Sequence, residues 1–157
     1  DLVKNLPTFI NPQNGWVQST NQNPFYVMGK YSLENKLVTK FVDYEKRLTN
    51  RSYVANELLS SNERIDLNRF IEIKFDNTYS KNSRQYKYLK SIAQYDQNIQ
   101  EAIKNWNRKT DIRNTNAGLG MCFMAQEWIS EMNSKSTPSY ESAKAECVPV
   151  SPDPSAC

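Results

Sequence analysis

The sequence predicts a mainly α-helical fold in which an irregular, turn-rich segment precedes a series of helices. Two observations predict it. Asparagine, glycine and proline turn signals are concentrated before residue 31. Apolar residues then recur at three- and four-residue spacing to about residue 132. We therefore expect a turn-rich segment at 1–31 and a helical segment at 32–133. The Ser-, Pro-, Lys- and Glu-rich remainder, 134–157, is expected to be a disordered or aberrant tail.

The turn-rich segment centres on residues 9–27, which read FINPQNGWVQSTNQNPFYV. Five consecutive neutral polar side chains, at 18–22, lie between aromatic residues that can bury and lock the backbone. One interpretation is an ordinary surface loop with Asx-turns. The other is a rigid turn that holds the Asn21 carboxamide where it can stabilise charge on a substrate oxygen. The turn signals are Asn11-Pro12, Asn14-Gly15 and Asn23-Pro24.

The helical segment contains five amphipathic patterns, two of which follow an aspartate suited to cap a helix N-terminus, Asp66 and Asp96. The last pattern is the strongest and predicts a long helix whose apolar stripe is core rather than a cofactor site. In chain order the patterned residues are Val38, Phe41, Val42 and Glu45; Tyr53, Val54, Leu58 and Leu59; Leu67, Phe70, Ile71 and Phe75; Ile99, Ala102, Ile103 and Trp106; and Ala117, Met121, Met124, Ala125, Trp128, Ile129 and Met132.

Composition indicates a thin or shared core and a weak electrostatic field. Mean hydropathy is −0.76 and 38% of residues are hydrophobic, which is meagre for an independent fold. The 20 basic and 17 acidic residues are scattered, so the net charge of +3 does not call for a nucleic-acid partner. Tyrosines interleaved with lysines in residues 81–90 could stack on bases. The simpler interpretation is a solvated helix face.

The cysteines and the apolar runs bear on compartment and ligands. Without an apolar run of 18 residues or an export signal, we expect no membrane partner. Cys122 lies on an apolar stripe and is expected to be a small buried hydrophobe. Cys147 and Cys157 flank a proline-rich stretch and could pair in an oxidising compartment. Since the chain has no histidine and no close cysteine spacing, neither a metal site nor a cofactor is expected.

Four segments in order resemble the beta chain of the penicillin acylase and acyl-homoserine-lactone acylase family, which belongs to the N-terminal-nucleophile hydrolases. They are NPQNGWVQSTNQNP at 11–24, the arginine and paired leucines of 51–59, KFD at 74–76 and WNRKTDIRNTNAG at 106–118. The resemblance covers about residues 6–132. It implies a fragment of a larger αββα fold and cleavage of a linear amide in an N-acyl substrate. That substrate is a beta-lactam side chain, hence antibiotic metabolism, or an acyl-homoserine lactone, and the compartment implied is periplasmic or secreted.

The same resemblance implies two site residues. The second asparagine of the family's N-x-N segment, with a backbone N–H, forms the oxyanion hole, and the corresponding residue is Asn21, although Ser19 replaces the first asparagine. Arg51 stands where the family has an arginine that orients the oxyanion-hole and nucleophile groups. Arg47 is the alternative if the register slips by one turn. We expect Trp106, Asn107 and Asp111, in the 106–118 segment, to be structural.

The family's nucleophile is the N-terminal serine of the beta chain, whose own α-amine acts as base. In the family that serine lies well upstream of the N-x-N segment, whereas this chain begins at Asp1 and has no histidine for a Ser/His pair. We therefore expect the chain alone to be inactive, with the alpha chain and the front of the beta chain as its missing partners. The alternative is a non-catalytic helical interaction module derived from the family.

Overall fold

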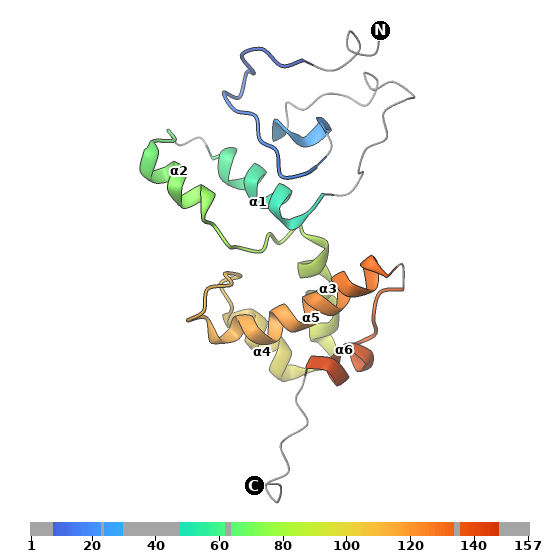
Figure 1. The fold of residues 1–157 in the computed structure, drawn as a ribbon. Helices are drawn as coiled ribbons and strands as arrows, with labels where there is room; N and C mark the ends of the chain where they lie inside the picture. The colour runs from blue at the N-terminus through green and yellow to red at the C-terminus, as the bar shows by residue number, and fades with distance from the viewer. Residues whose placement is uncertain (1–7, 23, 30–47, 62–63, 134–135, 148–157) are drawn as a thin grey trace, which may run out of the picture. The chain divides into compact units, whose positions relative to one another are not determined.

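The computed structural model describes residues 8–22, 24–29, 48–61, 64–133 and 136–147 (Figure 1). Within these ranges the chain forms six α-helices and no β-strand, with one isolated bridge between Thr78 and Lys109. The prediction of a mainly α fold is confirmed. The chain divides into two compact units, 1–76 and 77–157, whereas the sequence suggested boundaries near residues 31 and 133. The first predicted helical pattern, 38–45, lies outside the described residues.

The first unit contains the turn-rich segment, the short 3-10 helix η2 (Pro24–Tyr26), α1 (Asn50–Leu59) and α2 (Leu67–Lys74). A turn forms at the first predicted signals, since the Gly15 N–H donates to the Pro12 carbonyl at 2.8 Å. The Gln18 N–H donates to the Val27 carbonyl at 2.9 Å and closes the segment on itself. Residues 9–22 and 24–27 therefore form a structured loop that carries its own backbone bonds.

Gly29 lets the turn-rich segment close tightly. Its φ is +56°, and a Cβ atom added there would lie 3.3 Å from the Trp16 ring. A side chain at this position would be strained by the backbone and would also crowd the indole. Phe25 and Met28 in the same segment are buried, so aromatic and sulfur-containing side chains contribute to the core of this unit.

Side-chain caps set where α1 and α2 begin. The Thr49 hydroxyl accepts from the Ser52 N–H at 3.3 Å, and an Asp66 carboxylate oxygen accepts from the Arg69 N–H at 2.8 Å. The predicted cap at Asp66 is confirmed. The apolar residues of the predicted stripe nevertheless remain exposed: they are Leu67, Phe70 and Ile71 in α2 and Phe75 at its C-cap.

The second unit is a helical cluster built around its longest helix. It comprises α3 (Arg84–Ile92), η5 (Ala93–Tyr95), α4 (Gln97–Asn105), α5 (Thr115–Met132) and α6 (Tyr140–Cys147), and α5 packs against α3, α4 and α6 (Figure 1). Leu89 and Phe123 are fully buried at its centre. Gly120 allows the Trp106 ring to approach α5, because a Cβ atom there would lie 3.1 Å from the indole.

The tyrosines of α3 belong to this core. Tyr86 and Tyr88 are only 8% and 6% exposed, so their rings are not available to stack on bases. The nucleic-acid interpretation of residues 81–90 is therefore wrong. The intervening Lys87 and Lys90 are exposed, as a solvated helix face requires.

The long helix predicted from the 117–132 stripe exists, but only part of the stripe is core. Met124 is buried, whereas Trp128 and Met132 are 52% and 67% exposed. The buried face of the second half of α5 instead passes through Glu127 and Ser130. A stripe defined by apolar residues alone missed this face because its inward positions are polar.

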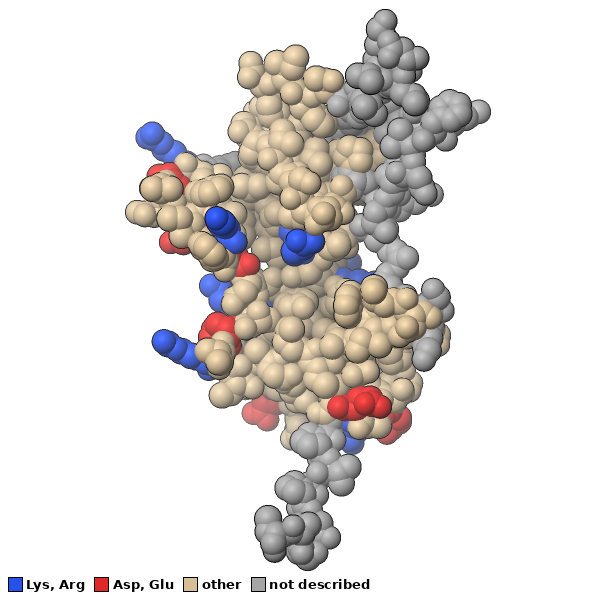
Figure 2. Space-filling model, viewed as in Figure 1, with Lys and Arg blue, Asp and Glu red and all other residues tan. Residues whose placement is uncertain are grey.

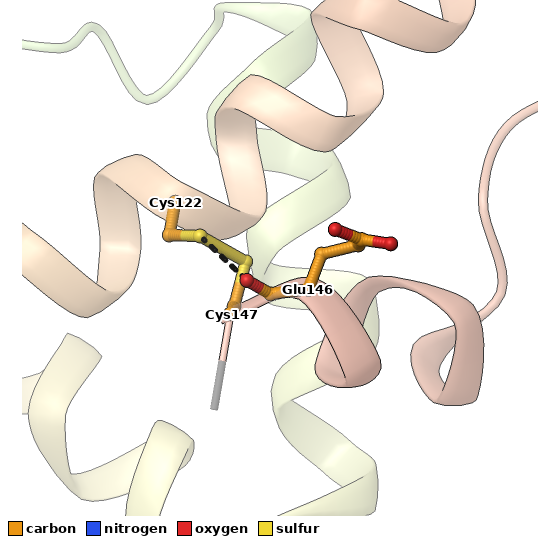
Figure 3. Close-up of a disulfide and its surroundings, with 3 residues drawn as sticks. All are labelled: Cys122, Glu146 and Cys147. Carbon is orange, nitrogen blue, oxygen red and sulfur yellow. Dashed lines mark hydrogen bonds between the residues drawn. A yellow bond between two sulfur atoms is a disulfide. The ribbon is translucent and has the colours of Figure 1, made fainter. Parts of the chain in front are cut away.

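A disulfide between Cys122 on α5 and Cys147 at the end of α6 corrects two predictions (Figure 3). Cys122 is not a free thiol in the core, and Cys147 does not pair with Cys157, which lies outside the described residues. The two helices bring the Cα atoms within 5.6 Å, inside the range that a disulfide spans. The Glu146 carbonyl oxygen lies 3.9 Å from the Cys122 sulfur.

The disulfide and one hydrogen bond hold α6 at both ends, so the expected disordered tail is wrong for residues 140–147. At the start of α6 the Tyr140 hydroxyl donates to the Asp96 carboxylate at 2.7 Å. That bond is the main reason why the pKa of Asp96 is lowered and the pKa of Tyr140 is raised. Asp96 also caps α4, as predicted, by accepting from the Asn98 N–H at 2.8 Å. Ala143 between these ends is buried in the core.

Replacing both bonded cysteines, Cys122→Ser with Cys147→Ser, is expected to lower the free energy of unfolding by about 3 kcal/mol. The bond closes a loop with a sequence separation of 25, and its loss frees the unfolded chain. Urea unfolding followed by tryptophan fluorescence measures the change. Cys157→Ser is the matched control and should unfold like the parent chain. Equal midpoints for the double variant and the parent under non-reducing conditions would show that the disulfide does not stabilise the fold.

Candidate functional site

The two site residues predicted separately from the sequence contact each other in the first unit. A guanidinium N–H of Arg51, at the start of α1, donates from Nη2 to the Asn21 Oδ1 atom over 2.8 Å. Both side chains are exposed. They come from positions 30 residues apart in the sequence. Because the oxygen of the carboxamide faces Arg51, its NH2 group points the other way. The contact therefore orients Asn21 as a neutral hydrogen-bond donor.

The backbone at Asn21 limits the directions that its side chain can take. Its φ is +63°, in the left-handed region, where asparagine is among the best tolerated residues other than glycine. The bend therefore restrains Asn21, and the first turn of α1 restrains Arg51. The guanidinium charge of Arg51 polarises the Asn21 carbonyl and so strengthens the NH2 group as a donor.

A polar network, which sequence reasoning missed, connects the Asn21 bend to α1. The Thr20 hydroxyl lies 2.9 Å from the Ser52 hydroxyl, and the Thr20 N–H donates to the Gln22 side-chain oxygen at 2.6 Å. Further along α1, Gln18 donates from Nε2 to the Asn56 side-chain oxygen at 3.4 Å. The only sequence signal for Thr20 and Ser52 is that they are the chain neighbours of Asn21 and Arg51.

The remaining residues considered from the sequence are Arg47 and three residues of the 106–118 segment. Arg47, the alternative to Arg51, lies outside the described residues. In the second unit the Trp106 indole N–H donates to the Lys109 carbonyl at 2.8 Å, and Asn107 accepts from the Lys109 N–H at 2.9 Å. Asp111 accepts from the Arg113 N–H at 3.1 Å. These are local contacts that shape a turn.

The described residues also bear on metals, membranes and charge. Nowhere among them do three side chains of the types His, Cys, Asp and Glu gather closely enough to hold a metal ion. None of the helices in the described ranges is long and apolar enough to cross a membrane. On the face shown in Figure 2, basic and acidic side chains are interspersed among neutral ones, which agrees with a net charge of only +3.

Comparison with known protein families gives a match that covers nearly the entire chain. The penicillin amidase family matches residues 3–148, which include the Asn21 bend, Arg51 and helices α1 to α6. Searches of curated proteins and of solved structures found no match. A family match of this extent is more than a shared short motif. The chain therefore belongs to the penicillin amidase family.

Proposed function

We propose that this chain supplies the oxyanion-hole donor of an acylase that hydrolyses a linear amide bond in an N-acyl substrate. The observation that supports the proposal best is the 2.8 Å contact from Arg51 to the oxygen of Asn21, since it turns the NH2 group outward. The substrate is a beta-lactam side chain or an acyl-homoserine lactone. Membership of the penicillin amidase family supports amide hydrolysis as the reaction class.

The proposed step begins when a serine oxygen attacks the carbonyl carbon of the amide. In this proposal the serine is the N-terminal nucleophile of another part of the acylase, and its α-amine takes the hydroxyl proton. The carbonyl oxygen becomes an oxyanion, to which the Asn21 NH2 group donates. The C–N bond then breaks, the leaving amine receives the proton, and water hydrolyses the acyl-serine ester. One such donor contributes about 2.7 to 4 kcal/mol to the transition state.

A carboxamide suits this role because it donates without carrying a net charge. A cation at the same place would also bind counterions and the carboxylate product. A neutral donor interacts mainly with the charge that develops on the oxyanion. Arg51 orients the carboxamide by donating a hydrogen bond to its oxygen. We further propose a periplasmic or secreted location, which the Cys122–Cys147 disulfide supports because such bonds persist in oxidising compartments.

The second candidate function is a non-catalytic interaction module of the same family. The exposed apolar side of α2 favours it, since Leu67, Phe70 and Phe75 are each more than half exposed. An amphipathic helix with such a face can bind a partner helix or peptide. In that case the Asn21 bend would be retained as scaffold only.

Hydrolysis assays distinguish the two functions. The acylase that contains this chain is expected to release the acyl group from an aromatic N-acyl beta-lactam or from a long-chain acyl-homoserine lactone. The isolated chain is expected to release neither, because the proposed nucleophile is not among its residues. Stoichiometric turnover by the purified isolated chain would contradict the placement of the nucleophile. Failure of the complete acylase on both substrate classes would favour the interaction module.

A further inference from the structure

Two hydrogen bonds lie side by side between the Asn21 bend and the start of α1. Asn21 contacts Arg51, and the residue before Asn21 contacts the residue after Arg51: the Thr20 and Ser52 hydroxyls are 2.9 Å apart. The first bond is exposed and belongs to the proposed site. The second is partly buried, since Ser52 is 0% exposed and Thr20 is half-buried. The pair of bonds joins the loop to the helix at two successive positions.

The hydroxyl protons of this region can be ordered in only one way. The Gln22 side-chain oxygen accepts from the Thr20 N–H at 2.6 Å and lies 2.5 Å from the Thr20 hydroxyl. Because that oxygen can only accept, the Thr20 hydroxyl must donate to it. Ser52 must then donate to Thr20, and Thr49, whose hydroxyl is 3.1 Å away, must donate to Ser52. Every hydroxyl donates once and accepts at least once.

Burial decides which of the two bonds holds the bend in place. A hydrogen bond between exposed groups competes with water, and its net contribution to order is small. A bond that is shielded from water is stronger, and losing one partner leaves the other without compensation. The partly buried contact between Thr20 and Ser52 is therefore better suited to hold the bend than the exposed contact between Arg51 and Asn21.

We propose that Thr20 and Ser52 are a positioning pair that holds the Asn21 carboxamide in its donor orientation. This inference rests on the proposed function, because its kinetic consequence requires Asn21 to donate to the oxyanion. Neither Thr20 nor Ser52 touches the reacting atoms; they act through Asn21 and Arg51. Gln22 completes the arrangement by fixing the direction in which the Thr20 proton points.

The test compares Thr20→Val, which keeps the shape but removes the hydroxyl, with Thr20→Ser, which keeps the hydroxyl, in the acylase that contains this chain. Thr20→Val is expected to lower kcat about ten- to a hundredfold with KM unchanged, because a donor displaced by about 1 Å loses transition-state contact. It is also expected to lower the NMR order parameter of the Asn21 side-chain amide toward flexible values. Thr20→Ser should retain both.

Thr110→Val is the matched control. It also removes a threonine hydroxyl, which in the second unit donates to the Asn77 carbonyl at 3.2 Å. It should leave kcat and the Asn21 order parameter unchanged. A Thr20→Val enzyme with the order parameter and kcat of the parent would overturn the inference, as would equal losses in Thr20→Val and Thr20→Ser. If Asn21→Ala keeps full turnover, the proposed function fails, while the order parameters still decide whether Thr20 positions Asn21.

Discussion

Asn21→Asp is expected to lower turnover of the acylase about a hundred- to a thousandfold. Aspartate has the same shape, tolerates the left-handed backbone at φ +63° and can still accept from Arg51. It has no NH2 group, however, and its charge repels the oxyanion. Binding of an uncleaved substrate should change little, because the lost interaction forms only in the transition state. Steady-state kcat and the Kd of a non-hydrolysable analogue measure the two effects.

Two further variants isolate the role of the donor. Asn21→Ala removes both the donor and the contact to Arg51, and should lose turnover by two to three orders of magnitude. Asn11→Asp is the matched control, because Asn11 is also exposed and also has a positive φ, 47°, in the same loop. It should behave like the parent enzyme. Unchanged turnover in Asn21→Asp would remove Asn21 from the proposed role.

Arg84→Met is expected to lower the free energy of unfolding by about 3 kcal/mol, because it leaves a buried carboxylate without its partner. Arg84 forms an ion pair through Nε with Oε1 of Glu127, whose side chain is 1% exposed on the inward face of α5. The value lies at the low end of the range for broken buried pairs, since Arg84 itself is 42% exposed. Urea unfolding measures the loss, provided that the dependence of the unfolding free energy on urea concentration is the same for both proteins.

The double variant Arg84→Met with Glu127→Gln should recover most of that stability, since no buried charge remains.

Tyr88→Phe is a second control. The Tyr88 hydroxyl is buried without a hydrogen-bond partner among the described residues, and its pKa is raised by burial and by the charge of Glu127. Removing it should change stability by less than about 1 kcal/mol. Arg84→Met with parental stability would show that Glu127 does not depend on the ion pair.

Three interactions between close neighbours in the sequence were predicted correctly. The caps at Asp66 and Asp96 bond to N–H groups two or three residues away, so the residues concerned are all visible in a short window. The turn at Gly15 depends on the same kind of local bond. Asn21 and Arg51 were proposed as site residues from motif spacing, one at a time, and their catalytic roles stay predictions.

Tertiary packing decided what local patterns could not. Hydrophobicity predicted α5 but not the inward face of its second half, because Glu127 becomes tolerable there only when Arg84 of α3 supplies the opposite charge. The sequence suggested Cys147 with Cys157, whereas the approach of α6 to α5 pairs Cys147 with Cys122.

By itself, the sequence determined that the chain is mainly helical, where two of its helices begin, and which asparagine and arginine to examine. Only the tertiary structure brought Arg51 to the Asn21 carbonyl and placed the hydroxyls of Thr20 and Ser52 beside that contact. The physical reason is the range of the forces involved. Caps and turns bond within a few residues, whereas side chains 30 or more positions apart meet only after a loop and a helix have packed together.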